Sequence, residues 1–130
     1  MKFLRIKENG LFRKAYKSGR RKGSHTVTVF VLKDRAAEFL RRSHPERLIV
    51  NRLGISASKK VGGAVQRNRA KRVIREAYRE IDKTYGIKKG FLIVITPRPE
   101  CTVTKMQNVK NDLLYCLKSL DMIGTSDENN

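Results

Sequence analysis

The residues best suited to chemistry in this 130-residue sequence lie in one basic stretch, residues 56–80, SASKKVGGAVQRNRAKRVIREAYRE. Seven Lys and Arg residues occur between Lys59 and Arg75, and no acidic residue lies among them. Such a density of like charge lowers the stability of a folded chain, because neighbouring cations repel one another. Guanidinium and ammonium groups match the oxygens of phosphate. The stretch therefore predicts a surface that binds phosphate.

A helix predicted over residues 64–85 would give these cations a common direction. At about 100° per residue, its apolar residues share one broad face. They are Ala70, Val73, Ile74, Ala77, Tyr78, Ile81 and Tyr85. The opposite face carries Asn68, Arg72, Arg75 and Arg79, flanked by Arg69 on one side and Lys71 on the other. A solvated face is the alternative, but such a face usually interleaves charges of both signs, and here the acids are confined to the second half. The clustering favours phosphate contact.

Gly62 and Gly63 lie directly before this helix, in SKKVGGA. Glycine lets backbone amides approach an anion closely, and the helix dipole favours negative charge at the N-terminus. The glycine pair is weak evidence alone and becomes stronger beside the arginine face.

Composition narrows the classes of partner. The formal net charge is +18, which indicates a polyanion: nucleic acid, an anionic membrane surface or an acidic protein. No apolar run approaches the ~18 residues that cross a bilayer, and the N-terminus lacks the pattern of a secretory signal. Two cysteines, Cys101 and Cys116, fit a reducing compartment. These features predict a cytoplasmic protein.

The elements that must position the basic stretch follow from periodicity. The patterns predict a helix at 8–18, a strand at 26–33 after a short extended piece, a strand at 52–58, a helix at 64–85, a strand at 90–96 and a helix at 103–120. Residues 34–49 are interpreted as a long connection, in which RAAEFLRR could form two helical turns before Pro45. We expect an α+β fold, a two-layer α/β sandwich with a small mixed sheet and elements in the order α-β-β-β-α-β-α. Residues 1–122 form one predicted domain, and residues 123–130 a polar tail.

Catalytic groups are not evident in the sequence. His25 and His44 lie far apart, and neither has a partner at metal-ligand spacing. The sequence offers no paired carboxylates, no recognisable Cys-His frame and no P-loop. We predict no catalytic residue and no metal or other cofactor held by the protein.

A second candidate site is aromatic. Phe12 and Tyr16, at i and i+4, share one face of the first helix, and Lys17 lies beside them. Rings surrounded by cations suit single-stranded RNA, because bases stack on rings while phosphates meet Lys and Arg. Burial of both rings in the core is an equally good interpretation of the residues alone.

The stretch SASKKVGGAVQRNRAKRVIREAYR resembles the signature of the bacterial ribonuclease P protein component, centred on Arg67, Asn68 and Arg69. FRKAYKSG, RLGISAS and GFLIVITPR resemble the same family in the same order, so the resemblance covers most of residues 8–120. The sequence departs from the family at Gly63, where Asn is common, and in its longer 34–49 connection.

The resemblance implies a protein subunit that binds a catalytic RNA and the 5′ leader of precursor tRNA, while the RNA, with Mg²⁺ at its own active site, removes the leader. It implies RNA contacts from one set of residues: Arg67, Asn68, Arg69, Lys71, Arg72, Arg75 and Arg79. It implies a leader cleft lined by another set: Phe12, Tyr16, Lys17, Phe30, Lys59 and Lys60. It also implies a left-handed βαβ crossover. A ribosomal or other structural RNA-binding protein is the alternative, and a protein-only nuclease is a third class.

Overall fold

The computed structural model describes residues 3–44 and 50–123. Its elements are β1 (Phe3–Arg5), α1 (Asn9–Ser18), β2 (Arg20–Gly23), β3 (Val27–Lys33), α2 (Arg35–Ser43), β4 (Asn51–Ile55), η1 (Lys59–Val61), α3 (Ala64–Tyr85), β5 (Phe91–Pro97), η2 (Pro99–Thr102) and α4 (Met106–Ser119). The strands form one five-stranded sheet. The predicted α+β class with a small mixed sheet is confirmed.

The sheet has the strand order β1-β4-β5-β3-β2. Its β4 strand runs parallel to both neighbours, whereas β3 runs antiparallel to β5 and to β2. Because α3 connects the parallel neighbours β4 and β5, the three elements form the expected βαβ unit. The left-handedness of this crossover stays a prediction.

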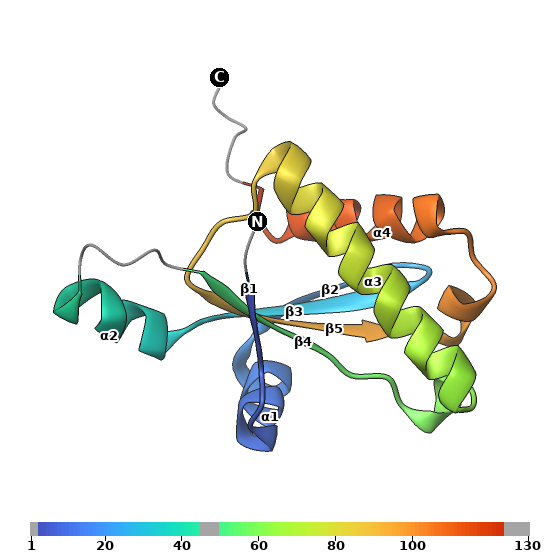
Figure 1. Cartoon of the computed structure of the whole chain (residues 1–130), viewed down its shortest axis with the longest axis horizontal. Helices are drawn as coiled ribbons and strands as arrows, with labels where there is room; N and C mark the ends of the chain where they lie inside the picture. Colours follow the sequence, from blue (N-terminus) through green and yellow to red (C-terminus); the bar gives the residue numbers. More distant parts are fainter. Residues whose placement is uncertain (1–2, 45–49, 124–130) are drawn as a thin grey trace.

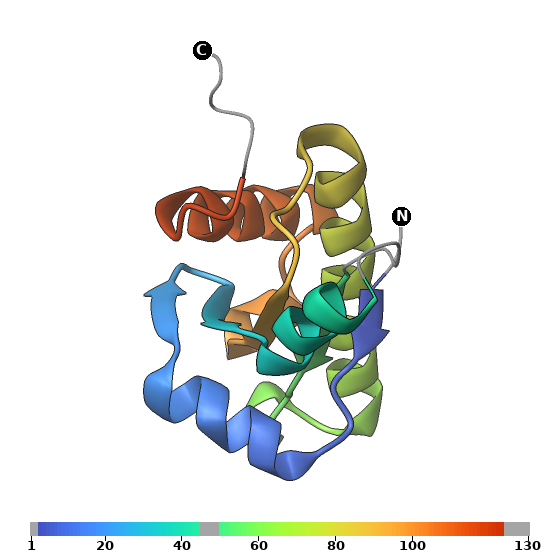
Figure 2. The same ribbon diagram turned by 90° about the vertical axis from the view of Figure 1, so that its left-hand side faces the viewer.

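Helices lie on both faces of the sheet (Figures 1 and 2): α3 and α4 cover one face, and α1 lies against the other, which adds a third layer to the two that were predicted. Alternation along β3 explains this arrangement, since Val29 and Val31 join the α3–α4 core while Phe30 joins the α1 cluster. The β5 strand has apolar residues on both faces, with Ile93 in the first cluster and Val94 in the second. The prediction of a strand buried on both faces is confirmed.

The strand β1 was not predicted, and the helix α2 was left open as an alternative to a connection. Residues 3–5 are too few to show a periodic pattern, and β1 forms because it pairs with residues 51–53 of β4. The interpretation of residues 34–49 as a connection was wrong for Arg35–Ser43, which form α2. Its N-terminus is favoured by Asp34, whose carboxylate accepts a hydrogen bond from the Ala36 amide at 3.0 Å.

The C-terminal boundary is described only in part. Of the predicted tail, Ile123 lies within the described residues; it is buried and pairs with Ile87 in an isolated β-bridge. Residues 124–130 and Pro45 lie outside the described residues.

A buried ion pair connects the start of α2 to the sheet. Arg52 of β4 donates to both carboxylate oxygens of Asp34, from Nε at 2.7 Å and from Nη2 at 2.9 Å. The side chain of Asp34 is only 4% exposed, and its backbone amide donates to the Gly90 carbonyl at 3.0 Å. The hydrogen bond to Asp34 raises the pKa of Arg52 above its ordinary value, against the opposing effect of burial. This pair therefore joins β3, β4, α2 and the start of β5.

We expect Arg52→Ala to lower the free energy of unfolding by about 3 kcal/mol, because it leaves the buried Asp34 carboxylate without its cation. Urea denaturation measures the change. The control is Arg42→Ala, which removes an exposed pair with Glu38 and should cost less than about 1 kcal/mol. Equal losses for the two variants would contradict the prediction.

Candidate nucleic-acid interface

The rotation of α3 about its axis is fixed by its buried face. Ala70, Ile74, Ala77, Tyr78 and Ile81 are at most 1% exposed and belong to the core that α3 forms with the sheet and α4. The Tyr78 hydroxyl also points inward, where it accepts a hydrogen bond from Asn51 Nδ2 at 3.1 Å, and burial raises its pKa. The helix cannot turn its opposite face inward without exposing these side chains.

All seven residues of the predicted RNA-binding set lie on α3, and we call them the α3 cationic surface. They are Arg67, Asn68, Arg69, Lys71, Arg72, Arg75 and Arg79. None is fully buried: Asn68, Arg72 and Arg79 are exposed, and the other four are partly buried. The six residues that helix spacing placed on one face are thus at least partly exposed, and so is Arg67, which was predicted from the family resemblance alone.

Few carboxylates neutralise this surface. Within residues 3–44 and 50–123, Arg79 is its one member with an ion pair, 3.7 Å from Glu76. The other acids of the helix pair with cations outside the surface, Glu80 with Lys110 at 3.0 Å and Asp82 with Lys89 at 2.7 Å. The first half of α3 therefore presents its positive charge to solvent.

Arg69 differs from its neighbours because the protein itself uses part of its guanidinium. Its Nη1 donates to the Thr102 carbonyl at 3.3 Å, which connects α3 to η2. A guanidinium has five N–H donors, so several remain for a ligand. This contact joins residues distant in the sequence, and helix periodicity could not reveal it.

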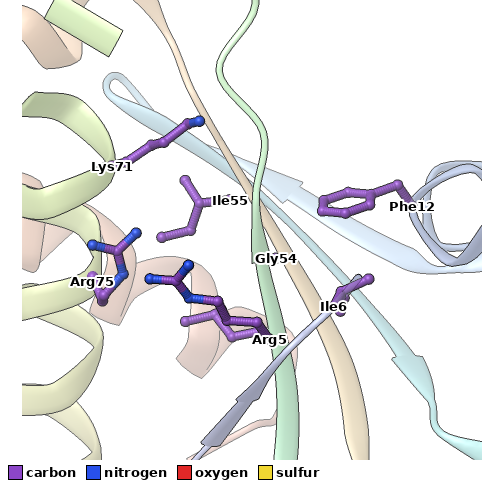
Figure 3. A pocket seen from close by; sticks show the side chains of 8 residues that line it. Arg5, Ile6, Phe12, Gly54, Ile55, Lys71 and Arg75 are labelled. Atoms are coloured by element: carbon purple, nitrogen blue, oxygen red, sulfur yellow. The ribbon is translucent and has the colours of Figure 1, made fainter. Parts of the chain in front are cut away.

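A hollow of about 190 Å³ lies where α3 meets the outer edge of β4, and we call it the edge hollow. Its lining residues are Arg5, Ile6, Phe12, Leu53, Gly54, Ile55, Lys71 and Arg75. In Figure 3 the guanidinium groups of Arg5 and Arg75 lie close together on the α3 side of β4, with Phe12 on the other side. None of the lining residues is acidic.

Positive charges repel one another at the edge hollow. Burial lowers the pKa of Arg75 from its ordinary value, and the charges of Arg5 and Arg79 lower it further. An anion between Arg5 and Arg75 would remove this repulsion. Arg5 was not predicted, because only the parallel pairing of β1 with β4 brings it to α3.

The aromatic residues predicted for the leader form one group, the α1 aromatic group, made of Phe12, Tyr16 and Phe30. Tyr16 is 39% exposed and meets Phe30 edge to face, with ring centroids 4.9 Å apart. Phe30 is 8% exposed, and Phe12 is partly buried against the same cluster. The rings thus belong to the packing of α1 on the sheet, while Tyr16 still presents an accessible surface.

Cations beside the α1 aromatic group come from two elements. Lys17 is exposed on α1, and the guanidinium carbon of Arg21 lies 5.6 Å from the Phe30 ring centroid. Arg21 was not predicted, although the basic run at the start of β2 was a signal for it. Lys59 and Lys60 are exposed in η1, just before α3, and no cation–π contact joins them to these rings among the described residues.

The two glycines before α3 have different roles. Gly62 has φ of 142°, a conformation that side chains other than glycine rarely adopt. Gly63 is the N-cap with φ of −74°, and no side chain caps the helix there. The first amides of α3 are therefore left for solvent or an anion.

Groups that serve catalysis in other proteins are buried or scattered in the described part of this chain. Cys101 and Cys116 are fully buried, and burial raises the pKa of both thiols. Residues 3–44 and 50–123 contain no group of three or more His, Cys, Asp or Glu residues placed to hold a metal ion. No helix in those ranges is long and apolar enough to cross a membrane.

Comparison with known proteins decides the family. The family model described as Ribonuclease P matches residues 1–121. The chain belongs to the ribonuclease P protein family. The ribonuclease P protein component of Clostridium botulinum strain Langeland is 32% identical over 118 residues, which cover 91% of this chain and 95% of that protein.

Solved structures of the family agree with this assignment. The RNase P protein of Staphylococcus aureus superposes with a TM-score of 0.73 at 29% identity, covering 95% of this chain and all of that one. The protein from Thermotoga maritima gives 0.69 at 28% identity, covering 88% and 96%. The predicted resemblance is confirmed, and membership favours a role in tRNA processing over that of a ribosomal protein.

Gly54 sets the distance between α1 and the sheet. A Cβ at this position would lie 2.6 Å from Cε1 and Cζ of Phe12.

We expect Gly54→Ala to displace Phe12 and lower the free energy of unfolding by about 1–3 kcal/mol. Gly10→Ala in α1 is the control, because its Cβ would meet nothing within 4 Å. It should be neutral or stabilising by up to about 1 kcal/mol. Urea denaturation compares the two, and a Gly54→Ala variant as stable as the control would refute this account.

Proposed function

We propose that this protein is the RNA-binding subunit of ribonuclease P, which holds the catalytic RNA on the α3 cationic surface. The supporting observation is the unneutralised first half of α3, held outward by a buried apolar face on the same helix. Arg72 is exposed and suited to bidentate phosphate contact. Asn68 can both donate and accept, and so suits a 2′-hydroxyl.

The 5′ leader of precursor tRNA would lie against the α1 aromatic group. Tyr16 offers an accessible ring for a base, while Lys17 and Arg21 supply cations for the adjoining phosphates. Lys59 and Lys60, in η1, would contact the backbone nearer the start of α3. The burial of Phe30 limits it to supporting Tyr16 rather than stacking on a base itself.

The edge hollow would join these two surfaces. It is lined by Lys71 and Arg75 from the α3 cationic surface and by Phe12 from the α1 aromatic group. We add Arg5 to the RNA-binding residues, since a phosphate between Arg5 and Arg75 would offset the repulsion between the exposed guanidinium of Arg5 and the partly buried guanidinium of Arg75.

We assign leader cleavage to the catalytic RNA and Mg²⁺ to the active site of that RNA. In this assignment the protein orients substrate and neutralises phosphate repulsion, and no side chain touches the reacting atoms. Pure protein incubated with precursor tRNA and Mg²⁺ should leave the substrate intact, whereas addition of a bacterial ribonuclease P RNA should restore leader removal. Cleavage by the pure protein would overturn the assignment.

Salt dependence tests the α3 cationic surface. Each phosphate contact releases counterions, so we expect Arg72→Gln and Arg75→Gln each to reduce the slope of log affinity against log salt by roughly one. Titrations of a bacterial ribonuclease P RNA at several salt concentrations measure the slope. Lys83→Gln, an exposed cation in the last turn of α3, is the control and should leave it unchanged. A flat salt response of the native protein would disprove phosphate binding.

The leader contact predicts a difference between substrates. With the catalytic RNA present, Tyr16→Ala should weaken binding of precursor tRNA roughly tenfold, because base stacking on an aromatic ring contributes about 1–3 kcal/mol. Mature tRNA, which has no leader, should bind as before. Tyr16→Phe keeps the ring and serves as the control. An equal loss for both tRNAs would argue against a leader contact.

A further inference from the structure

The α2 helix projects from the body of the protein. In Figure 1 it extends beyond the end of the sheet, away from α4, and in Figure 2 it lies in front of the sheet, toward the viewer. Its first turn is fixed, because Asp34 is held by Arg52 and Ala37 is buried. The helix is therefore held in a defined place while much of its surface meets solvent.

The outward face of α2 combines an aromatic ring with two arginines. Arg35, Phe39 and Arg42 follow at i, i+4 and i+7, which places them along one line of the helix. Phe39 is 69% exposed. Arg42 pairs with Glu38 at 3.5 Å, but side-chain exposures of 81% and 54% make this a weak pair that a phosphate could replace.

More positive charge lies between α2 and the sheet. Lys33, Arg41 and Lys89 line a hollow of about 160 Å³ beside the first residues of β5. Lys89 is neutralised by Asp82 at 2.7 Å, and Glu38 is the one acidic residue of the lining. Lys33 and Arg41 add to the charge of Arg35, so the helix and its base carry a positive excess.

We propose that α2 is a second RNA-binding element, on which an unpaired nucleotide of the catalytic RNA stacks against Phe39 while Arg35 and Arg42 contact its flanking phosphates. This inference rests on the proposed function. An exposed ring between arginines suits RNA, since every base has a stacking face and its phosphates lie within reach of the cations.

The position of α2 favours the catalytic RNA over the tRNA leader. The hollow beneath α2 adjoins the start of β5, whereas Arg69 binds Thr102, just beyond the end of that strand. The seven residues of β5 separate the two places by roughly 20 Å. A partner that contacts α2 and the first half of α3 together must be large, as a structured RNA is.

An apolar protein partner fits α2 less well. Phe39 is the one large apolar side chain exposed among the α2 residues whose burial the structure describes, and cations surround it. Interfaces between proteins are depleted of charge at their centre and need a contiguous packed area. The surface of α2 has the opposite composition.

Binding of the full-length protein to a bacterial ribonuclease P RNA tests the proposal. Phe39→Leu keeps apolar area but loses the ring, so affinity should fall about tenfold at every salt concentration, whereas Phe39→Tyr should bind like the native protein. The double variant Arg35→Gln with Arg42→Gln should reduce the salt slope by roughly 1.5 to 2. Val103→Ala, at an 86% exposed site outside α2, is the control. Thermal unfolding verifies that each variant is folded.

The outcomes separate this inference from the proposed function. If Arg72→Gln reduces the salt slope and the α2 variants behave like native protein, the role of α2 is refuted alone. If Arg72→Gln also has no effect, the proposed function fails and the α2 inference fails with it.

Phe39→Leu should weaken the assembled complex equally for precursor and mature tRNA. A loss confined to precursor tRNA would identify the leader as the occupant and overturn the assignment to catalytic RNA.

Discussion

The rotation of α3 is the constraint on which the other features depend. Full burial of an Ile or a comparable side chain contributes about 1.5–3 kcal/mol, and Ile74, Tyr78 and Ile81 all lie in the core. Two exposed unit charges 4 Å apart in water interact by only about 1 kcal/mol, and salt screens them further. The free energy gained by burying the apolar face of α3 therefore exceeds the repulsion between the cations on its other face. The helix keeps one orientation, and those cations are held outward. A polyanion that lies along the helix removes the repulsion and gains a preorganised surface.

The charged residues of α3 have different roles in its two halves: those of the second half stabilise the fold, and those of the first half are left for a ligand. In the second half, Glu80 meets Lys110 of α4 and Asp82 meets Lys89 before β5, so these acids connect the helix to its neighbours. In the first half, the Arg69 contact with a backbone carbonyl makes a comparable connection without using a carboxylate. A carboxylate there would compete with phosphate for the neighbouring cations. The location of the acids thus explains how one helix is firmly attached and still leaves one end for a ligand.

Elements whose signal is local were predictable. The bounds of α3 match the predicted residues 64–85, and β5 differs by one residue, because long amphipathic and apolar runs specify their own structure. The last helix begins at Met106 rather than 103, since Pro99–Thr102 form a separate turn of 3-10 helix. β1 and α2 depend on distant partners, β1 on β4 and α2 on Arg52, 18 residues after Asp34. Nothing within either short segment encodes that partner.

The residues of the candidate site divide in the same way, into those that a local pattern predicts and those that depend on distant partners. Helix spacing places six of the seven α3 residues, all but Arg67, on one surface. Arg5 reaches Arg75 only through strand pairing, and Arg21 reaches Phe30 only across an antiparallel ladder. The choice between core and ligand-binding rings could not be made from sequence, because the burial of each ring depends on how α1 packs against the sheet. Phe30 supports Tyr16 from the buried side, and Tyr16 keeps an exposed face. Phe12 lines the edge hollow from one side of β4 and Arg75 lines it from the other, so the hollow connects the α1 aromatic group to the α3 cationic surface.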